Sequence, residues 1–173
     1  SIFIEQEDFR EEANKKYKRL VLGKRVRLRG AYVIEADEAI KDSSGNIVEV
    51  RARIIDGTLG KDPEDGVKPK GVIHWVSAAQ NLDCEVRLYD RLFNDESPDA
   101  SGKNFLDAMN PDNLEILNNC KAEVSLGKAI VGNSFQFERQ GYFCLDSKYS
   151  TTEKPVFNRT ISLKDSFGKE EQE

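Results

Sequence analysis

The sequence predicts a mainly β protein built from small barrels or sandwiches, and three features lead to this fold class. Short segments alternate apolar and polar residues, as strands with one buried face do. Clusters of Gly, Pro, Asp and Asn separate these segments at short intervals. Long helical patterns are few, so packed sheets are expected rather than a helix bundle.

The first expected elements lie before residue 24. The chain opens on SIFIEQED, a strand-like stretch without an initiator Met, which is typical of a piece of a longer chain. A helix is expected over residues 8–22, because Asp8 and Glu11 have the spacing of a capping box. Apolar residues then recur at helical spacing from Phe9 to Leu20, as on the buried face of a surface helix.

The rest of the chain is expected to form strands joined by turns and loops. Strands over 25–36 and 47–55 should form a hairpin across the SSGN turn at 43–46. Further strands are expected over 71–76, 85–93, 114–124 with a following helical turn, 134–139, 141–146 and 155–163. One helical turn is expected over 104–109 before a proline. The polar segments 60–71 and 94–104 should be loops, and the second is a candidate domain boundary.

Basic residues concentrate between Asp8 and Gly30, in a chain that is acidic as a whole. The 173 residues include 26 Lys and Arg against 31 Asp and Glu, a net charge of −5. The segment itself holds nine basic residues and three acidic ones. Arg25, Arg27 and Arg29 alternate with apolar residues, so one strand face should carry all three guanidinium groups. This pattern favours a polyanion such as a nucleic acid, and a merely solvated surface is the alternative.

Composition excludes several classes of protein. Hydrophobic residues make up 38% of the chain and charged residues 33%, which is enough for a modest core. No apolar run is long enough to span a membrane, and the first residues lack the apolar core of a signal peptide. Cys84, Cys120 and Cys144 are odd in number and far apart, so neither a disulfide framework nor a zinc site is predicted. The expected compartment is a reducing cytoplasm.

No catalytic or metal-binding constellation is predicted. His74 is the only histidine and lies in an apolar segment, which is typical of a core residue. Tyr32, Tyr89 and Trp75 are likewise more typical of a core than of a stacking surface. The acids of residues 62–65 match no calcium loop, so a solvated turn is favoured there.

Several long motifs, in a fixed order, resemble one known family. They are DFREEANKKYKRLVLGK, VRLR, AYVI, KGVIHWVSA, EVRLYDRLF, FQFERQGYFCLDS and TEKPVFNRTISLKD. They resemble the C-terminal anticodon-binding region of the glutaminyl-tRNA synthetase family over residues 3–167. The resemblance implies two β-barrels like those of a ribosomal protein that binds 5S rRNA, with a few short helices. It assigns 1–18 plus 104–167 to a proximal barrel, 19–103 to a distal barrel and 168–173 to a disordered tail.

The resemblance also implies which residues contact the anticodon. Lys18 and Arg19 match a pair placed near the last anticodon base. Arg27 and Arg29 match the arginines that approach the first base and its phosphates. The complete set of expected RNA-binding residues is Lys16, Lys18, Arg19, Arg27, Arg29, Gln136 and Arg139.

The pocket for the central uridine is expected at Gln136 and Arg139. On a regular strand these two residues would face opposite ways, so the turn after them must bring both side chains to one place. The family completes this pocket with an arginine that would lie upstream of Ser1. Lys16 departs from the family pattern, which often has Gln there, so the resemblance does not assign base reading to Lys16 and leaves a phosphate contact open.

The function that this resemblance implies is binding of the tRNA(Gln) anticodon loop. The full-length enzyme would attach glutamine to the tRNA with ATP and Mg, whereas this chain should be inactive alone and need no cofactor. The sequence has no HIGH-like or KMSKS-like signature and no glycine-rich strand-to-helix turn. The expected partners are the tRNA and the catalytic domain of the same chain, in a cytoplasmic monomer without membrane contact.

Three alternatives remain at this stage. The first is the anticodon-binding region of an archaeal or eukaryotic type of glutamyl-tRNA synthetase, which shares the barrel architecture. The second is a ribosomal-type barrel that binds rRNA, for which duplex RNA would be the preferred ligand. The third is a structural β-domain whose basic surface has no ligand.

Overall fold

The computed structural model describes residues 1–102 and 104–163, and the tail expected over 168–173 lies outside them. The chain divides into two compact units, Ser1–Ala79 and a second that begins at Gln80. Strands dominate both units and the helical segments are short 3-10 turns, which confirms the mainly β fold class. Closure of the sheets into barrels stays a prediction. Within the described residues, no helix has the length and apolar character needed to cross a bilayer.

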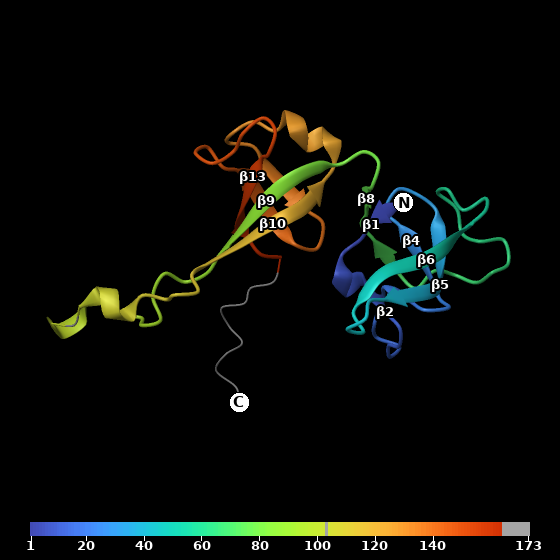
Figure 1. Ribbon diagram of the computed structural model, residues 1–173, viewed down its shortest axis with the longest axis horizontal. Helices are drawn as coiled ribbons and strands as arrows, with labels where there is room; N and C mark the ends of the chain where they lie inside the picture. Colours follow the sequence, from blue (N-terminus) through green and yellow to red (C-terminus); the bar gives the residue numbers. More distant parts are fainter. Residues whose placement is uncertain (103, 164–173) are drawn as a thin grey trace. The chain divides into compact units, whose positions relative to one another are not determined.

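The first unit is built on a sheet with the strand order β6-β5-β4-β7 (Figure 1). Its elements are β1 (Ile2–Phe3), η1 (Gln6–Asp8), β2 (Phe9–Arg10), β3 (Leu20–Val21), β4 (Arg25–Leu28), β5 (Val33–Lys41), β6 (Ile47–Ile55), β7 (Val72–Ile73) and β8 (Val76–Ser77). Strands β5 and β6 pair antiparallel, so the predicted hairpin is confirmed. The carboxylate of Asp42 closes its turn by accepting the backbone N–H groups of Ser44 at 2.9 Å and Asn46 at 2.8 Å.

The helix predicted over 8–22 is wrong. Phe9 and Leu20 are buried as expected, but they lie opposite each other in the parallel pair β2–β3. The segment between them consists of bends, a turn and irregular backbone, and Ala13 in the middle of the expected apolar stripe is exposed. A short helix depends on packing of its apolar face. Here the two ends of the segment pair as strands and bury Phe9 and Leu20 in the core beside Val26. This burial outweighs the local preference for a helix.

Three smaller expectations in the first unit also change. The strand over 25–36 is interrupted, because a turn through Gly30 separates β4 from β5. The strand over 71–76 is interrupted at His74, whose Nε2 lies 3.2 Å from Glu5 Oε1. Trp75 packs against the core as expected, whereas Tyr32 is 38% exposed.

The second unit is built on a sheet with the strand order β10-β9-β13-β12-β11 (Figure 1). Its elements are β9 (Leu82–Tyr89), η2 (Ala100–Gly102), η3 (Phe105–Ala108), β10 (Leu114–Ala122), η4 (Val124–Lys128), β11 (Ser134–Phe137), β12 (Gly141–Leu145) and β13 (Val156–Ile161). The expected helical turns near 104–109 and after the 114–124 strand are confirmed as η3 and η4. Phe143 and Phe157 fill the core; Phe143 stacks on Phe137 with ring centroids 4.3 Å apart. Tyr89, expected in the core, is 48% exposed.

The division of the chain differs from the expected one. Residues 1–18 belong with the rest of the first unit, since β1 pairs with β8 and β2 with β3. Strand β9, expected in the 19–103 barrel, pairs with β10 and β13 of the second unit. The loop 94–104 therefore lies in the connection between two paired strands, which extends away from their sheet (Figure 1). Polar composition indicates a loop but does not reveal whether the flanking strands pair with each other. The assignment of the units as proximal and distal stays a prediction.

Candidate nucleic-acid interface

Three of the four lysines of the basic segment, Lys15, Lys16 and Lys18, are exposed on the loop between β2 and β3. The fourth, Lys24, is exposed just before β4. The Tyr17 hydroxyl donates to the carbonyl of Glu7 at 2.7 Å and so fixes the loop. The carbonyl of Lys18 lies against Gly71, where a Cβ would come within 2.0 Å of its oxygen. Ammonium groups that project from a fixed loop into water can meet phosphates at little desolvation cost.

Arg19, unlike these lysines, is engaged inside the unit. Its Nε lies 3.2 Å from Asp8 Oδ1, and its Nη1 lies 3.2 Å from Glu7 Oε1. The Asp8 side chain is 0% exposed, whereas the Arg19 side chain is 29% exposed. A buried carboxylate needs a charged or hydrogen-bonding partner, so Arg19 stabilises the fold at this point.

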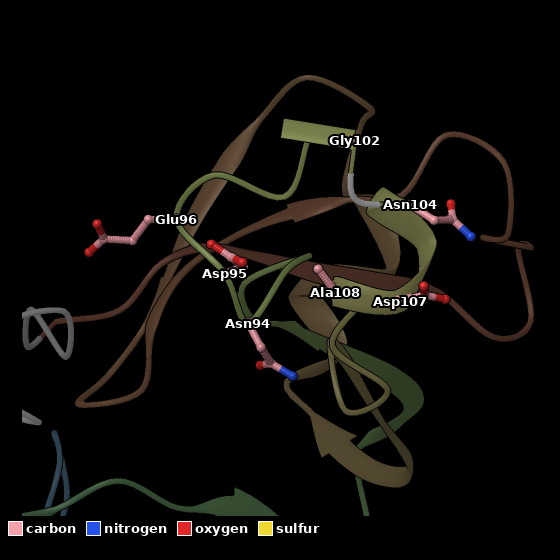
Figure 2. A pocket seen from close by; sticks show the side chains of 7 residues that line it. All are labelled: Asn94, Asp95, Glu96, Gly102, Asn104, Asp107 and Ala108. Atoms are coloured by element: carbon pink, nitrogen blue, oxygen red, sulfur yellow. The ribbon is translucent and has the colours of Figure 1, made fainter. Parts of the chain in front are cut away.

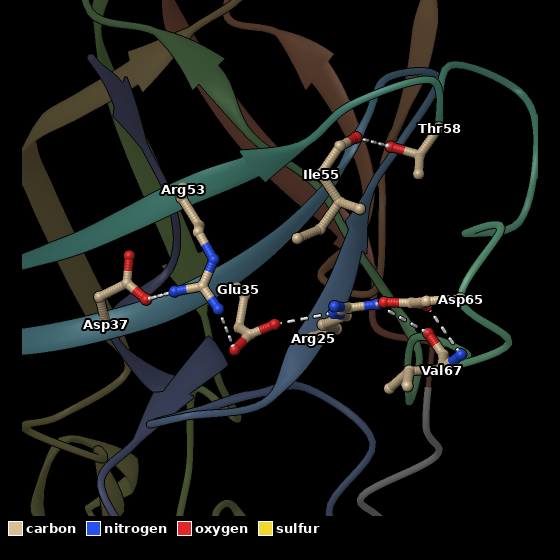
Figure 3. A network of polar contacts seen from close by, with 8 residues as sticks. All are labelled: Arg25, Glu35, Asp37, Arg53, Ile55, Thr58, Asp65 and Val67. Carbon is tan, nitrogen blue, oxygen red and sulfur yellow. Dashed lines mark hydrogen bonds and ion pairs between the residues drawn. The ribbon is translucent and has the colours of Figure 1, made fainter.

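Arg25 on β4 is held between two carboxylates (Figure 3). Its Nε donates to Glu35 at 2.8 Å, and its Nη1 lies 2.7 Å from Asp65 Oδ2. Glu35 also binds Arg53 at 2.6 Å, so a charged row runs across β4, β5 and β6. The two carboxylates raise the pKa of Arg25. The pKa of Asp65 is lowered, first by the backbone N–H of Val67 and then by Arg25.

Arg27 is directed into the loop that follows β6. Its Nη1 donates to the carbonyl of Thr58 at 2.7 Å, and its Nη2 donates to the carbonyl of Lys61. The same Nη2 lies 3.3 Å from Asp62 Oδ1. Thr58 is buried, and its hydroxyl accepts the backbone N–H of Val33 at 2.9 Å. Figure 3 shows this hydroxyl also donating to the carbonyl at the end of β6. Arg27 therefore holds the loop 58–62 against the sheet.

A cavity of about 720 Å³ lies beside Arg27. Its lining residues are Arg27, Gly30, Ala31, Leu59, Gly60, Lys61 and Asp62. The lining combines apolar surface with charged groups of both signs, a combination that suits a flat, partly apolar group such as a nucleobase. Arg29 follows at the exposed end of β4, where its carbonyl accepts the indole N–H of Trp75 at 3.0 Å.

Gln136 and Arg139 lie on one hairpin of the second unit. Gln136 is exposed on β11 and is the register partner of Tyr142 on β12. Arg139 lies in the turn between these strands and has φ +65°, in the left-handed region. The predicted turn after Gln136 is thus present, and the convergence of both side chains on one pocket stays a prediction.

A second cavity, of about 850 Å³, lies in the connection between β9 and β10 (Figure 2). Its lining residues are Asn94, Asp95, Glu96, Gly102, Asn104, Asp107 and Ala108. Among the described residues, three carboxylates and no basic group line it, a lining that does not favour a polyanion. The sequence-predicted RNA-binding residues are not among its lining residues.

The loop acids were the functional feature that the sequence interpretation missed. Asp62 and Asp65 are exposed, as expected of a solvated turn, but they also bind Arg27 and Arg25, which the sequence interpretation did not foresee. The cause is topological. The loop connects β6 to β7, and β7 pairs in parallel with β4, so the loop must pass beside the β4 arginines. In the sequence, only the complementary charges of the loop acids and the β4 arginines indicated that these residues would pair.

Comparison with known proteins agrees with these features. Two family models match, both described as "tRNA synthetases class I (E and Q), anti-codon binding domain", over residues 1–55 and 72–146. The chain is 58% identical to glutamine–tRNA ligases of Escherichia coli O157:H7, Escherichia coli K12 / DH10B and Shigella boydii serotype 18. Each alignment covers 168 residues, which is 97% of this chain and 30% of the relative. This chain belongs to the anticodon-binding domains of the class I tRNA synthetases for glutamate and glutamine.

Proposed function

We propose that this chain binds the anticodon loop of tRNA(Gln), as the anticodon-binding part of a glutamine–tRNA ligase. The observation that carries the proposal is the 58% identity to glutamine–tRNA ligases over nearly the whole chain. The alignment covers 168 residues, which is 97% of this chain. The chain spans about a third of the length of these relatives, so the activity of a complete ligase is itself part of the proposal.

The proposed roles of the basic residues follow the anticodon. Lys18 and Arg19 lie near the last base, and Arg27 and Arg29 lie near the first base and its phosphates. An arginine has five N–H donors in a planar fork, so donors that are not used by protein carbonyls remain for RNA. In this proposal Arg27 both holds the loop 58–62 and forms one wall of a base pocket. Lys16 is exposed and takes a phosphate.

Gln136 and Arg139 are proposed to contact the central uridine. An amide side chain offers a donor and an acceptor together, which matches the hydrogen-bonding edge of uracil. Unpaired loop bases expose this edge and are the usual targets of sequence-specific RNA recognition. The exposed position of Gln136 on β11 supports this role.

In the full-length enzyme, glutamine would be activated with ATP and Mg and transferred to the tRNA in the cytoplasm. Anticodon binding would influence the distant catalytic domain, because the two sites of one monomer would be linked by a coupling free energy. The chain itself is proposed to be a binding module without catalysis, cofactor or membrane contact. Its proposed partners are the tRNA and the catalytic domain.

The test is binding to a tRNA(Gln) anticodon stem-loop and to the same stem-loop with a changed central base, across a salt series. Salt-dependent binding with preference for the native loop is expected. Equal affinity for both stem-loops would show that the chain binds polyanions in general and does not recognise the anticodon. A tRNA(Glu) stem-loop included in the series tests the glutamyl alternative, which predicts the opposite preference, and a duplex RNA tests the ribosomal alternative.

A further inference from the structure

A row of three exposed side chains crosses the hairpin that carries Gln136. Gln136 on β11 is the register partner of Tyr142 on β12, and Tyr142 is the register partner of Ile161 on β13. Tyr142 is 41% exposed and Ile161 is 63% exposed. The alternate residues of β11, Phe135 and Phe137, pack against the core instead. Directly opposed residues have their Cβ atoms about 4.5–5.5 Å apart, so this row is one continuous surface.

The backbone of Tyr142 is fixed by a bulge. The register of β12 and β13 shifts between Tyr142 and Phe143, which leaves Thr160 as an additional residue on β13. The Thr160 hydroxyl donates to the carbonyl of Tyr142 at 3.0 Å. At Gly141 a Cβ would come within 2.5 Å of the Ile161 carbonyl, so only glycine permits this approach. Bulges re-aim side chains at binding sites, and this one sets the direction of Tyr142.

Tyr142 differs from the other tyrosines of the second unit in what its side chain contacts. The guanidinium of Arg87 covers the ring of Tyr149 at 4.0 Å from the centroid. The hydroxyl of Tyr89 donates to Asn158 at 3.4 Å. Among residues 80–102 and 104–163, the side chains of Gln136 and Tyr142 have no hydrogen bond or ion pair with the protein. Their polar groups and the Tyr142 ring are therefore available to a ligand.

The backbone next to Tyr142 is also packed against β13 through Gly141. The stem of Arg159 on β13 packs over Gly141, with Cδ and Cγ at 3.2 and 3.4 Å from the position of a Cβ there. An amide edge and an aromatic face are together the chemistry that reads one unpaired base, by hydrogen bonds and stacking.

We propose that Tyr142 is the stacking platform for the base that Gln136 contacts, which makes it a further base-contacting residue of this chain. The inference rests on the proposed function and extends it, because it adds a residue and an interaction to the central-base site. The ligand is a planar pyrimidine in a single-stranded loop. Stacking would hold the base flat beside Gln136, so that the amide meets its edge rather than water.

The experiment compares two stem-loops, one with uridine and one with dihydrouridine at the central position. Dihydrouridine keeps the hydrogen-bonding edge but loses the planar aromatic ring. Stacking is worth about 1–3 kcal/mol per base, or about 5- to 150-fold in affinity. The native chain should therefore bind the uridine loop more tightly by a factor in this range. Equal affinity for both loops would overturn the proposal without any substitution.

Variants provide the second arm. Tyr142→Ala should weaken binding of the uridine loop to the level of dihydrouridine and add nothing further on the dihydrouridine loop. Tyr142→Phe, which keeps the ring, should bind within about twofold of the native chain. Tyr89→Ala, another exposed tyrosine of the same sheet, is the matched control and should bind as the native chain does. Native affinity of Tyr142→Ala would overturn the proposal.

The two proposals fail in distinguishable ways. If the native chain does not prefer the native anticodon loop over one with a changed central base, the proposed function fails. If that preference holds but Tyr142→Ala binds the uridine loop with the affinity of the native chain, only the stacking role fails. Circular dichroism and thermal unfolding of each variant establish that the comparison is made between folded proteins.

Discussion

In the first unit Arg19, Arg25 and Arg27 bind carboxylates and carbonyls of the protein itself, whereas in the second unit Gln136 and Tyr142 face solvent. The difference is one of preorganisation. The arginines are fixed before RNA arrives, at the cost of donors already in use. The Gln136–Tyr142 surface keeps its donors and its ring, and the bulge fixes the backbone there instead of side-chain contacts.

Substitutions should therefore behave differently in the two units. In the first unit, removing an arginine changes the protein and the RNA contact together. In the second unit, removing Gln136 or Tyr142 should change RNA binding while the folded state stays as it is. Surface positions without internal contacts usually alter stability by less than about 0.5 kcal/mol when substituted.

The largest stability effect is expected at Arg19. Arg19→Ala removes the cation beside the buried Asp8 carboxylate. Breaking a buried pair costs about 3–5 kcal/mol, and the partial exposure of Arg19 reduces this to about 2 kcal/mol. Urea unfolding followed by the fluorescence of Trp75, in the same unit, measures the change. Lys18→Ala, at an exposed neighbouring position, is the control and should unfold as the native chain does; equal stability of both variants would contradict a structural role for Arg19.

Arg27→Ala should weaken anticodon-loop binding by about 1–3 kcal/mol and loosen the protein locally. The amide of Lys61 donates to the carbonyl of Thr58, inside the loop that Arg27 holds, so its hydrogen exchange should become faster. Gln136→Ala should lose binding without any change in amide exchange. If Arg27→Ala loses binding with the exchange of Lys61 unchanged, Arg27 acts as an RNA ligand alone and the contrast between the units disappears.

The sequence predicted β9 and β11 of the second unit well because both alternate apolar and polar residues. In β11 the alternating Phe135 and Phe137 pack inward and Gln136 faces outward, as their period requires. The helix prediction for residues 8–22 was wrong because the deciding contact is not local. The apolar spacing there fits a helix, but the decisive contact between Phe9 and Leu20 is a strand pairing that no local pattern encodes.

The positions of the β4 arginines were predictable from the sequence, but their contacts were not. Alternation placed Arg25, Arg27 and Arg29 on one strand, and the strand β4 includes the first two. The engagement of Arg25 with Asp65 depends on a loop forty residues away in the sequence. Such a contact follows from the parallel pairing of β4 and β7, which is a property of the whole topology and not of either segment.

Acid should release the contact between Arg25 and Asp65. The Val67 N–H and Arg25 lower the pKa of Asp65, so the folded state favours the charged carboxylate. Its stabilising contribution is present above the ordinary pKa of the carboxyl group and is lost as the pH falls through the lowered value. The amide resonance of Val67 should report this titration in an NMR pH series, and Asp65→Asn should abolish it. A midpoint at or above the ordinary aspartate value would show that neither contact favours the charged form.

The smallest effect is expected at Lys15, which is exposed on the loop between β2 and β3. A lysine that meets only phosphate contributes by releasing a counterion, so Lys15→Ala should lower the slope of log affinity against log salt by about 1. The loss should be the same for loops with the native and the changed central base, because a phosphate carries no sequence information. Gln136→Ala should do the reverse, removing the preference between the loops while leaving the salt slope unchanged. If the affinity lost by Lys15→Ala depends on the central base of the RNA, the protein loop between β2 and β3 also takes part in base recognition. Preorganised and open surfaces would then share that recognition.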